Sequence, residues 1–381
     1  MPSNRLRQLH DAGQSIWLDY IDRTMLGNGD LVRRIRDDAL TGMTSNPTIF
    51  EKALAEGHAY DEQLSSAPAG MSSWELFELV ETDDVRAACD LFMPVYEATK
   101  GGDGFVSLEV SPGVANDAEA TIEEGRRLWK TVGRPNVMIK VPGTAEGARA
   151  VRRLIAEGIN VNITLLFSID AHRRVIEAYL AGLEERAAAG GPIDHVASVA
   201  SFFVSRVDTE VDKRLDALVA ARGEAFRKEA DSFRGKTAIA NAKLAYQLFR
   251  ESFSGPRWQA LAAKGAVLQR PLWASTSTKN PAYRDVMYVE DLIGPDTVNT
   301  MPLATIEAFR DHGVIARTVD ARVERERKLI ADLEALGISM KDVTDKLLVD
   351  GLASFQKSFE GLIAGLERKT KELGREVVAS R

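Results

Sequence analysis

Short apolar runs alternate with longer stretches of helical period along the whole chain. Eight runs have the character of β-strands: 15–21, 41–46, 104–110, 136–141, 158–165, 195–204, 266–275 and 296–301. Amphipathic segments lie between them, which is the pattern of a parallel sheet connected by crossover helices. Eight such strands over about 300 residues match the size of a closed barrel better than an open sheet. The pattern predicts an α/β fold built on a single (β/α)8 TIM barrel.

Two of the connecting helices have recognisable ends. Thr144 precedes the amphipathic segment 145–157, and Gly158 follows it. Ser168 precedes the segment 169–189 in the same way, and a pair of glycines follows. Serine and threonine side chains accept hydrogen bonds from first-turn amides, and glycine is common after the last turn. We expect both helices to cover the outside of the barrel.

Three segments exceed a minimal barrel: a helical pair at about 72–100, a charged helical stretch at about 207–264, and the tail. The tail predicts two helices, and the second carries an apolar stripe formed by Val343, Leu347, Phe355, Phe359, Leu362 and Leu366. Such a stripe usually packs on its own domain and less often on a partner subunit. We therefore expect a barrel domain at 1–317 and a C-terminal helical extension at 318–381 packed on it.

Lys140 lies in one of the strands. Within 136–141, Lys140 shares a face with Met138, whereas three apolar residues share the opposite face. The apolar face fits under the helices, so Lys140 is expected to point into the barrel near its carboxyl-terminal end. Loss of water there favours the free amine that attacks a carbonyl. A lone strand lysine more often extends to solvent or pairs with a carboxylate.

Two carboxylates near strand ends favour the catalytic interpretation of Lys140 over the structural one. Asp19 stands near the end of the first strand, and Glu109 stands near the end of the third. A Schiff-base mechanism needs one acid for the hydroxyl proton of the substrate and another for the carbinolamine and imine steps. Each acid alone could serve a structural ion pair. Two acids and a lysine at three strand ends instead favour catalysis.

Amides and a hydroxyl accompany these groups. Asn160, Asn162 and Thr164 share the inward face of the strand 158–165. Leaving a buried polar group unpaired costs roughly 1–3 kcal/mol, which favours a role in ligand binding. Asn46 precedes Pro47, which holds it extended toward the barrel mouth while the proline begins a helix. A simple turn at Asn46 is the alternative.

The end of the sixth strand predicts an anion site. Ser201 and Arg206 lie where this strand ends and a helix begins, and a hydroxyl, a guanidinium and a helix N-terminus bind anions together. The next strand ends in the segment 274–281, which adds hydroxyls and Lys279. Loops after late barrel strands commonly hold phosphate. Thr276 and Thr278 in that segment have the pattern of ordinary cap residues.

Composition excludes several classes of protein. The formal net charge of −7 argues against a nucleic-acid binder. The single cysteine, Cys89, cannot form an internal disulfide and fits a core position. No apolar stretch has the length of a signal or membrane segment, so we expect a cytoplasmic protein without membrane contact. Glycine-rich nucleotide motifs and histidine pairs with metal-ligand spacing are missing, so neither a cofactor nor a metal is expected.

Four motifs together resemble the transaldolase family, in its longer bacterial type. They are TGMTSNPTIF, VMIKVPGTAEG, INVNITLLFS and SFFVSRVD, and the resemblance spans roughly residues 14–315. The lysine and INxNxTLLF motifs are specific to that family. The resemblance implies that Lys140 forms a Schiff base with C2 of a ketose phosphate and that Asp19 exchanges the C4 hydroxyl proton. It also implies that Glu109 and Thr164, through a water, handle the protons of imine formation and hydrolysis.

The same resemblance assigns the binding residues. Asn46 and Asn162 would orient a dihydroxyacetone unit, and Ser201 and Arg206 would hold the phosphate beside Phe203. The implied reaction, in the pentose phosphate pathway, transfers this unit from sedoheptulose 7-phosphate to glyceraldehyde 3-phosphate. The products are erythrose 4-phosphate and fructose 6-phosphate, and phosphorylated ketoses and aldoses are the only partners implied. No cofactor or metal takes part.

One segment departs from the family pattern. Where the family often has a serine and an arginine two positions apart, this chain has Ser275 and places its cation at Lys279. We carry Ser275 over as a substrate-binding residue and infer Lys279 as its partner. A lysine would act on phosphate as a point charge, without a bidentate fork.

Two other functions remain open. A fructose 6-phosphate aldolase on the same barrel would release dihydroxyacetone, and product analysis with and without an acceptor aldehyde separates release from transfer. A silent barrel that only binds sugar phosphates or scaffolds a partner would be marked by loss of the lysine or the acids, all of which are present. The motifs leave a monomer and a homodimer equally open.

Overall fold

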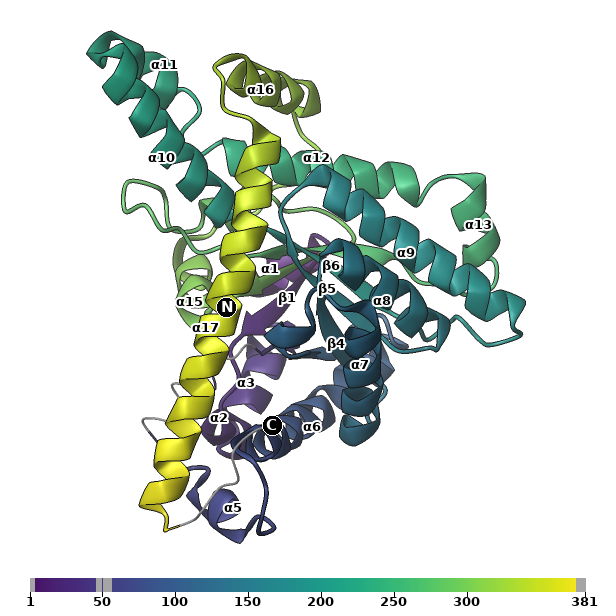
Figure 1. The fold of residues 1–381 in the computed structure, drawn as a ribbon. Helices are drawn as coiled ribbons and strands as arrows, with labels where there is room; N and C mark the ends of the chain where they lie inside the picture. Colours follow the sequence, from purple (N-terminus) through teal and green to yellow (C-terminus); the bar gives the residue numbers. More distant parts are fainter. Residues whose placement is uncertain (1–3, 46–49, 51–56, 375–381) are drawn as a thin grey trace.

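Eight parallel strands close into a barrel. The computed structural model describes residues 4–45, 50 and 57–374. The strands are β1 (Gln14–Asp19), β2 (Leu40–Thr44), β3 (Phe105–Glu109), β4 (Val137–Pro142), β5 (Val161–Leu166), β6 (Ser198–Phe203), β7 (Gln269–Ala274) and β8 (Thr297–Met301). They follow one another around the barrel in chain order, and β8 pairs with β1 to close it. Figure 1 shows the barrel strands with helices packed around them. The predicted (β/α)8 barrel is confirmed, and each predicted strand overlaps one of the eight.

Helices surround the barrel and extend beyond it. They are α1 (Arg5–Asp11), α2 (Arg23–Gly27), α3 (Asp30–Asp37), α5 (Asp61–Ser66), α6 (Ser73–Ala98), η1 (Pro112–Val114), α7 (Ala118–Val132), α8 (Ala145–Ala156), α9 (Ile169–Ala188), α10 (Ser205–Arg222), η2 (Glu224–Phe226), α11 (Arg227–Asp231), α12 (Thr237–Ser252), α13 (Pro256–Ala262), α14 (Met287–Glu290), α15 (Leu303–His312), α16 (Val323–Ala335) and α17 (Met340–Glu372). Thr144 and Ser168 cap α8 and α9 as predicted, because each side-chain oxygen accepts an amide hydrogen of the first turn. None of the helices in the described ranges is long and apolar enough to cross a membrane.

The predicted helical pair at about 72–100 is wrong. Residues Ser73–Ala98 form one continuous helix, α6, which begins at a capping box between Ser72 and Glu75. Pro94 lies near its end, where the helix loses one backbone hydrogen bond but keeps its direction. Buried apolar residues, Cys89 among them, line α6 and hold it against the barrel. Burial raises the pKa of the Cys89 thiol above its usual range, which fits a core residue.

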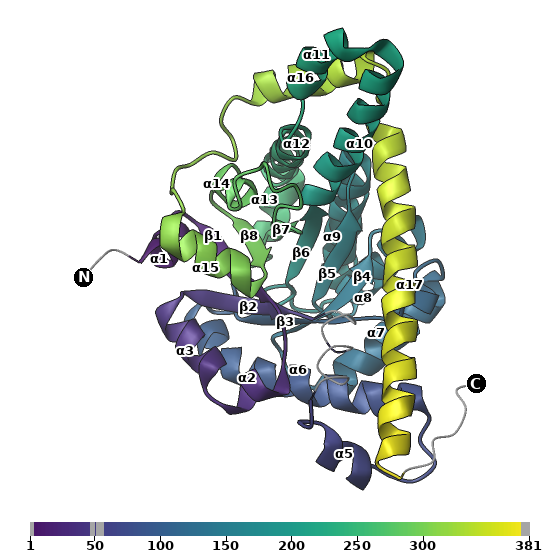
Figure 2. The ribbon, with the colours of Figure 1, turned by 90° about the vertical axis from the view of Figure 1, so that its left-hand side faces the viewer.

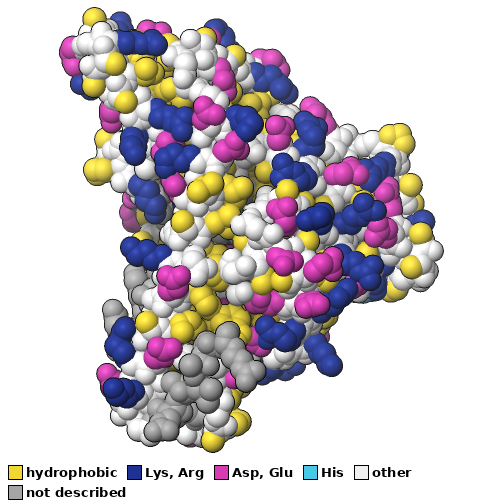
Figure 3. Space-filling view, in the orientation of Figure 1, with side chains coloured by type: hydrophobic (Ala, Val, Ile, Leu, Met, Phe, Trp, Pro, Cys, Tyr) yellow, Lys and Arg dark blue, Asp and Glu magenta, His cyan; other side chains and the backbone are white. Residues whose placement is uncertain are grey.

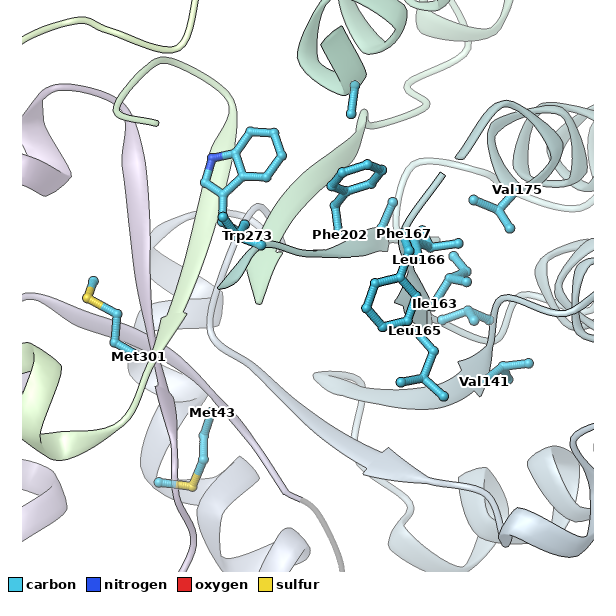
Figure 4. Close-up of a cluster of buried hydrophobic side chains, with 14 of the residues drawn as sticks. Met43, Val141, Ile163, Leu165, Leu166, Phe167, Val175, Phe202, Trp273 and Met301 are labelled. Carbon is cyan, nitrogen blue, oxygen red and sulfur yellow. The ribbon is translucent and has the colours of Figure 1, made fainter. Parts of the chain in front are cut away.

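The alternation of side chains along the strands builds two apolar layers. Inside the barrel, large side chains fill the space between the strands: Trp17, Phe105, Met138, Val199, Leu272 and Val298. Outside, a second layer packs between strands and helices, with Val141, Ile163, Phe202 and Trp273 among its members (Figure 4). The inner layer supports the polar side chains that stand at the carboxyl-terminal end.

Leu165 departs from this alternation. The sequence pattern predicts it on the outer face of its strand, yet it lines the cavity at the barrel mouth. The pairing of β5 with β6 shifts register between Ile163 and Leu166, and Leu165 has a φ of 58°. Such a bulge inserts one residue and re-aims the side chains around it. Outward packing therefore continues at Leu166, which is fully buried.

The C-terminal helix α17 crosses the open end of the barrel. It contacts α6, η1, β5 and α10, and it runs along one edge of the molecule beside the strands (Figure 2). Val343, Leu347, Leu362 and Leu366 of its apolar stripe are buried. Charged side chains of both signs are scattered over this face of the molecule, and apolar ones gather near its middle (Figure 3).

His172 is a buried histidine of α9 whose ring has no polar partner. Both ring nitrogens lack a hydrogen-bond partner among the described residues, and the ring packs against Phe202 at a centroid distance of 5.8 Å. Burial lowers its pKa from 6.5 to about 3. The unfolded chain therefore binds the proton first as pH falls, so His172 costs stability progressively between these two values.

We expect His172→Met to be more stable than the wild type, and increasingly so in acid. Methionine fills a similar volume and removes two unpaired polar atoms, which gains about 1 kcal/mol near pH 7. The advantage should grow by up to about 1.4 kcal/mol per pH unit below about 6.5. Denaturant titrations of both proteins at several pH values measure this difference. A difference that stays constant with pH would show that the ring is solvated or paired.

Candidate active site

A cavity of about 830 Å³ opens at the carboxyl-terminal ends of the strands. Its walls contain most of the side chains singled out from the sequence, namely Asp19, Glu109, Lys140, Thr164, Ser201, Phe203, Arg206, Ser275 and Lys279. Strands β1 and β3–β7 deliver them, because parallel strands present their carboxyl ends at one edge. Asn46 lies outside the described residues. Asn162 lies directly beneath this wall.

Lys140 and Glu109 form a buried ion pair. They are register partners on β4 and β3, and Lys140 Nζ donates to Glu109 Oε2 at 2.8 Å. The ammonium also donates to the carbonyl of Ser45 at 3.3 Å. Burial raises the pKa of Glu109 above its ordinary value, and the charge of Lys140 partly opposes that rise. Lys140 thus points into the barrel as predicted, and a group able to exchange its proton touches it.

Asp19 is held by hydroxyls from neighbouring strands. Thr44 Oγ1 donates to Asp19 Oδ1 at 2.9 Å and lies 3.0 Å from the hydroxyl of Thr300. The negative charge of Asp19 contributes to the raised pKa of Glu109, so the two acids act on one another. Thr44 and Thr300 were not among the predicted site residues. Their signal was weak, because a strand threonine is common anywhere in a sheet.

Asn162 anchors the floor of the cavity. It is register partner to Lys140, and its side chain is fully buried. Its Nδ2 donates to Ser107 Oγ at 2.9 Å, and its Oδ1 accepts from Ser201 Oγ at 2.6 Å. The amide therefore positions Ser201, which lines the cavity. Ser107 is a further polar residue that the sequence analysis missed.

Arg206 is a half-buried cation. It lies in the first turn of α10, and its guanidinium makes no hydrogen bond or ion pair within the described part of the chain. Its guanidinium carbon lies 5.1 Å from the centre of the Phe203 ring. Burial lowers its pKa below the ordinary value for arginine, with Asp19 opposing that shift. A desolvated guanidinium at the start of a helix is suited to bind an anion.

Ser275 and Lys279 line the same cavity as Arg206. Ser275 Oγ is 3.0 Å from Ser205 Oγ, which links the end of β7 to the start of α10. Lys279 is exposed at the rim, where its Nζ donates to Ser277 Oγ at 2.8 Å. Thr276 was predicted to be an ordinary cap residue, but it is buried and its hydroxyl donates to Asn299 of β8 instead of capping a helix. Lys279 therefore offers an exposed point charge at the rim and not the bidentate fork of an arginine.

Backbone strain marks two of the lining residues. Leu165 and Ser275 have φ values of 58° and 55°, in the left-handed region that disfavours residues with a Cβ. Each such conformation costs on the order of 1–3 kcal/mol and persists where surrounding structure holds it. Both residues lie where a strand enters the cavity wall. The strain turns the chain so that Thr164 and the Ser275 hydroxyl reach the site.

Helix α17 completes the cavity from the side that faces away from the barrel. Gly351, Ser354, Phe355 and Ser358 line it. The sequence analysis assigned Phe355 to an apolar stripe and gave the other three no role. Among the described residues there is no group of three or more histidine, cysteine, aspartate or glutamate side chains that could hold a metal ion.

Comparison with known proteins identifies the family. The family model of transaldolase/fructose-6-phosphate aldolase matches residues 16–366. The chain belongs to this family. The match extends beyond the motif-bearing region into α17, so most of the C-terminal helix is part of what the family shares.

Individual transaldolases are similar over nearly the full length. The transaldolase of Thermobifida fusca (strain YX) is 51% identical over 360 residues, which are 94% of this chain and 96% of the relative. The transaldolase of Trichodesmium erythraeum (strain IMS101) is 48% identical over 377 residues, 98% of this chain and 99% of the relative. Transaldolase 2 of Nostoc sp. (strain PCC 7120) is 47% identical over 378 residues, with the same coverage.

Proposed function

We propose that the chain is a transaldolase that uses Lys140 to transfer a dihydroxyacetone unit between sugar phosphates. The donor is sedoheptulose 7-phosphate, the acceptor is glyceraldehyde 3-phosphate, and the products are erythrose 4-phosphate and fructose 6-phosphate. The observation that carries the proposal is a buried amine 2.8 Å from Glu109 Oε2 in a cavity shared with Asp19 and Arg206. Relatives named transaldolase over nearly the whole chain support it.

The first step is attack of Lys140 on the C2 carbonyl of the ketose. The ammonium must first lose a proton, and Glu109 accepts it because burial has raised the pKa of that carboxyl. The amine forms a C2–N bond while the carbonyl oxygen takes up a proton. Loss of water then leaves a positively charged imine on Lys140, with Thr164 beside it to hold the departing or attacking water.

Asp19 acts in the cleavage step. It takes the proton of the C4 hydroxyl while the C3–C4 bond breaks, and the bonding electrons move into the imine to form an enamine. The aldose leaves with C4 as its aldehyde carbon. Thr44 keeps the carboxylate of Asp19 directed at this position through its 2.9 Å hydrogen bond.

Transfer reverses these steps with a different aldehyde. The enamine carbon attacks the carbonyl of the acceptor, and Asp19 returns the proton to the new hydroxyl. Water then hydrolyses the imine and frees Lys140. Transfer rather than release requires the enamine to outlast one exchange of aldehydes, and a cavity closed on its outer side by α17 limits the access of water.

The remaining assignments follow from this reaction. Ser201, Phe203, Arg206, Ser275 and Lys279 would bind the phosphate end, and Asn46 and Asn162 would orient the dihydroxyacetone unit. We place the enzyme in the cytoplasm, where phosphorylated sugars are retained by their charge. We further propose that 1–317 is the catalytic barrel and 318–381 an extension packed on it.

Borohydride trapping tests the covalent step. Incubation of the wild-type protein with fructose 6-phosphate and borohydride should leave a reduced three-carbon adduct on Lys140, located by peptide mass mapping. Lys279→Ala, which removes the other described lysine that lines the cavity, is the matched control and should still be trapped on Lys140 at saturating substrate. An adduct on another lysine, or none in a preparation that turns over substrate, would falsify the Schiff-base assignment.

A further inference from the structure

One face of α17 is directed at the substrate cavity. Gly351, Ser354, Phe355 and Ser358 follow the spacing i, i+3, i+4 and i+7, which places them on a single side of a helix. The helix crosses the barrel end beside β5 and α10, the two elements that carry Thr164 and Arg206 (Figures 1 and 2). Its middle turns are therefore part of the wall around the substrate.

Gly351 permits a close approach between α17 and the anion position. A Cβ built on Gly351 would lie 3.0 Å from Leu165 Cδ2 and 3.8 Å from Arg206 Nη1. The helix backbone thus rests on Leu165, whose left-handed conformation brings it there, and it covers the guanidinium of Arg206. A glycine inside a helix lowers helix stability by about 1 kcal/mol relative to alanine. The close contact with Leu165 explains why a glycine stands at this position.

Both ends of α17 are fixed, so its middle cannot swing away freely. Leu347 is buried on the N-terminal side of Gly351, and Leu362 is fully buried on the C-terminal side. Phe359 packs between Trp74 and Phe77 of α6, at centroid distances of 5.0 and 5.9 Å. The segment between these anchors is a rigid wall rather than a lid.

The polar and apolar groups of this wall suit the far end of a phosphorylated sugar. Lys140 fixes the three-carbon unit at the barrel centre, so the carbons beyond C4 extend toward Arg206 and α17. Ser354 is exposed and offers a hydroxyl to that end of the cavity, whereas Phe355 is half-buried and limits its width. Ser354 and Arg206 line the same cavity, so the hydroxyl and the guanidinium offer two donors to a phosphate bound there.

We propose that Gly351, Ser354 and Phe355 of α17 select the phosphorylated end of the donor ketose, with Gly351 setting the depth available above Arg206 and Ser354 contacting the phosphate. The inference rests on the proposed function. It gives the C-terminal helix a role in specificity in addition to packing.

The test compares two donors, fructose 6-phosphate and unphosphorylated fructose, in the full-length protein. Ser354→Ala should raise KM for fructose 6-phosphate about 10-fold, the loss of one hydrogen bond to a charged group, with kcat nearly unchanged. Gly351→Ala should raise the same KM by a similar or larger factor, because the methyl group presses on Leu165 and takes up space beside Arg206. Neither substitution should change KM for fructose. Ser354→Thr keeps the hydroxyl, so its KM for fructose 6-phosphate should equal that of the wild type.

Val349→Ala is the matched control, because Val349 lies on the same helix and is 66% exposed. It should leave both KM values at the wild-type level. Equal changes for the two donors, unchanged KM values in both α17 variants, or a loss confined to kcat would overturn the inference. Ser354 is exposed, so its variant is expected to fold even if Gly351→Ala does not.

Failure of this inference can be told apart from failure of the proposed function. If wild type is trapped by borohydride on Lys140 but the α17 variants keep wild-type KM values, only the role of α17 is wrong. If wild type forms no adduct on Lys140, the Schiff-base function itself is wrong.

Discussion

Lys140→Ala is expected to lower kcat by at least about 10⁴-fold, the largest effect of any substitution in the chain. Alanine leaves no amine to bond with C2, so the electrons of the C3–C4 bond have no cationic imine to move into. Among the described residues Lys279 is the other lysine that lines the cavity, and it is exposed at the rim, so we do not expect it to replace Lys140. A coupled assay of fructose 6-phosphate formation measures the loss.

Lys140→Arg separates the chemistry from the charge. Arginine keeps a cation beside Glu109 but does not deprotonate near neutral pH, so it should be as inactive as alanine. Retention of more than about a tenth of wild-type kcat in either variant would contradict a nucleophilic role.

Misfolding is the main competing explanation for an inactive Lys140 variant. It can be tested by replacing both members of the buried ion pair. Removing one member of a buried pair leaves the other uncompensated, which costs about 3–5 kcal/mol when the remaining group stays charged. Glu109 can instead take up a proton, because burial already raises its pKa. The double variant Lys140→Met with Glu109→Gln carries no buried charge at these positions and should match the wild type in thermal stability while remaining inactive.

The barrel and the inward position of its central polar side chains could be predicted from the sequence, because side chains along a strand alternate between its two faces. Polar residues at alternate positions of a strand with apolar neighbours must face inward once helices cover the outside. Lys140 and Glu109 follow this rule and meet as register partners at the barrel mouth. The start of α10 could be predicted as well, because it depends only on neighbouring residues: a strand ends, and an arginine lies in the first turn of the helix that follows.

Two kinds of feature could not be predicted from the sequence: breaks in the alternation of side chains along a strand, and contacts between segments far apart in the chain. Leu165 was predicted on the outer face because nothing in a single sequence announces the bulge between Ile163 and Leu166. The contact of Thr44 with Thr300 joins residues 256 positions apart. The position of α17 depends in the same way on packing across the whole domain. Its stripe predicted a buried face and included Phe355, but the other three residues directed at the cavity are a glycine and two serines without an apolar signal.

Arg206→Ala is expected to raise KM for phosphorylated sugars by about 10- to 150-fold, with a smaller change in kcat. The guanidinium is half-buried, has no ion pair in the described residues, and lies over the Phe203 ring in the wall of the cavity. Contacts to a charged group are worth about 1.5–3 kcal/mol, which corresponds to that range of affinity. Steady-state kinetics with fructose 6-phosphate measure the change.

The unphosphorylated substrate decides whether Arg206 acts on phosphate. Dihydroxyacetone occupies the Lys140 end of the cavity and carries no phosphate, so its KM should stay near the wild-type value. Arg214→Ala, on the same helix but paired with Glu210 at 2.9 Å, is the matched control and should leave both KM values unchanged. Equal increases for the two substrates would remove the phosphate assignment.

The physical reason for a large effect is that Arg206 is costly for the protein without a ligand. Partial burial disfavours its charge and lowers its pKa, and the charge of Asp19 opposes that shift. A bound phosphate supplies the missing countercharge and recovers that cost as binding free energy. Arg206→Lys should recover part of the affinity but not all of it, because an ammonium cannot make the paired contacts of a guanidinium. A lysine variant that binds phosphorylated sugars as tightly as the wild type would show that the site needs only charge.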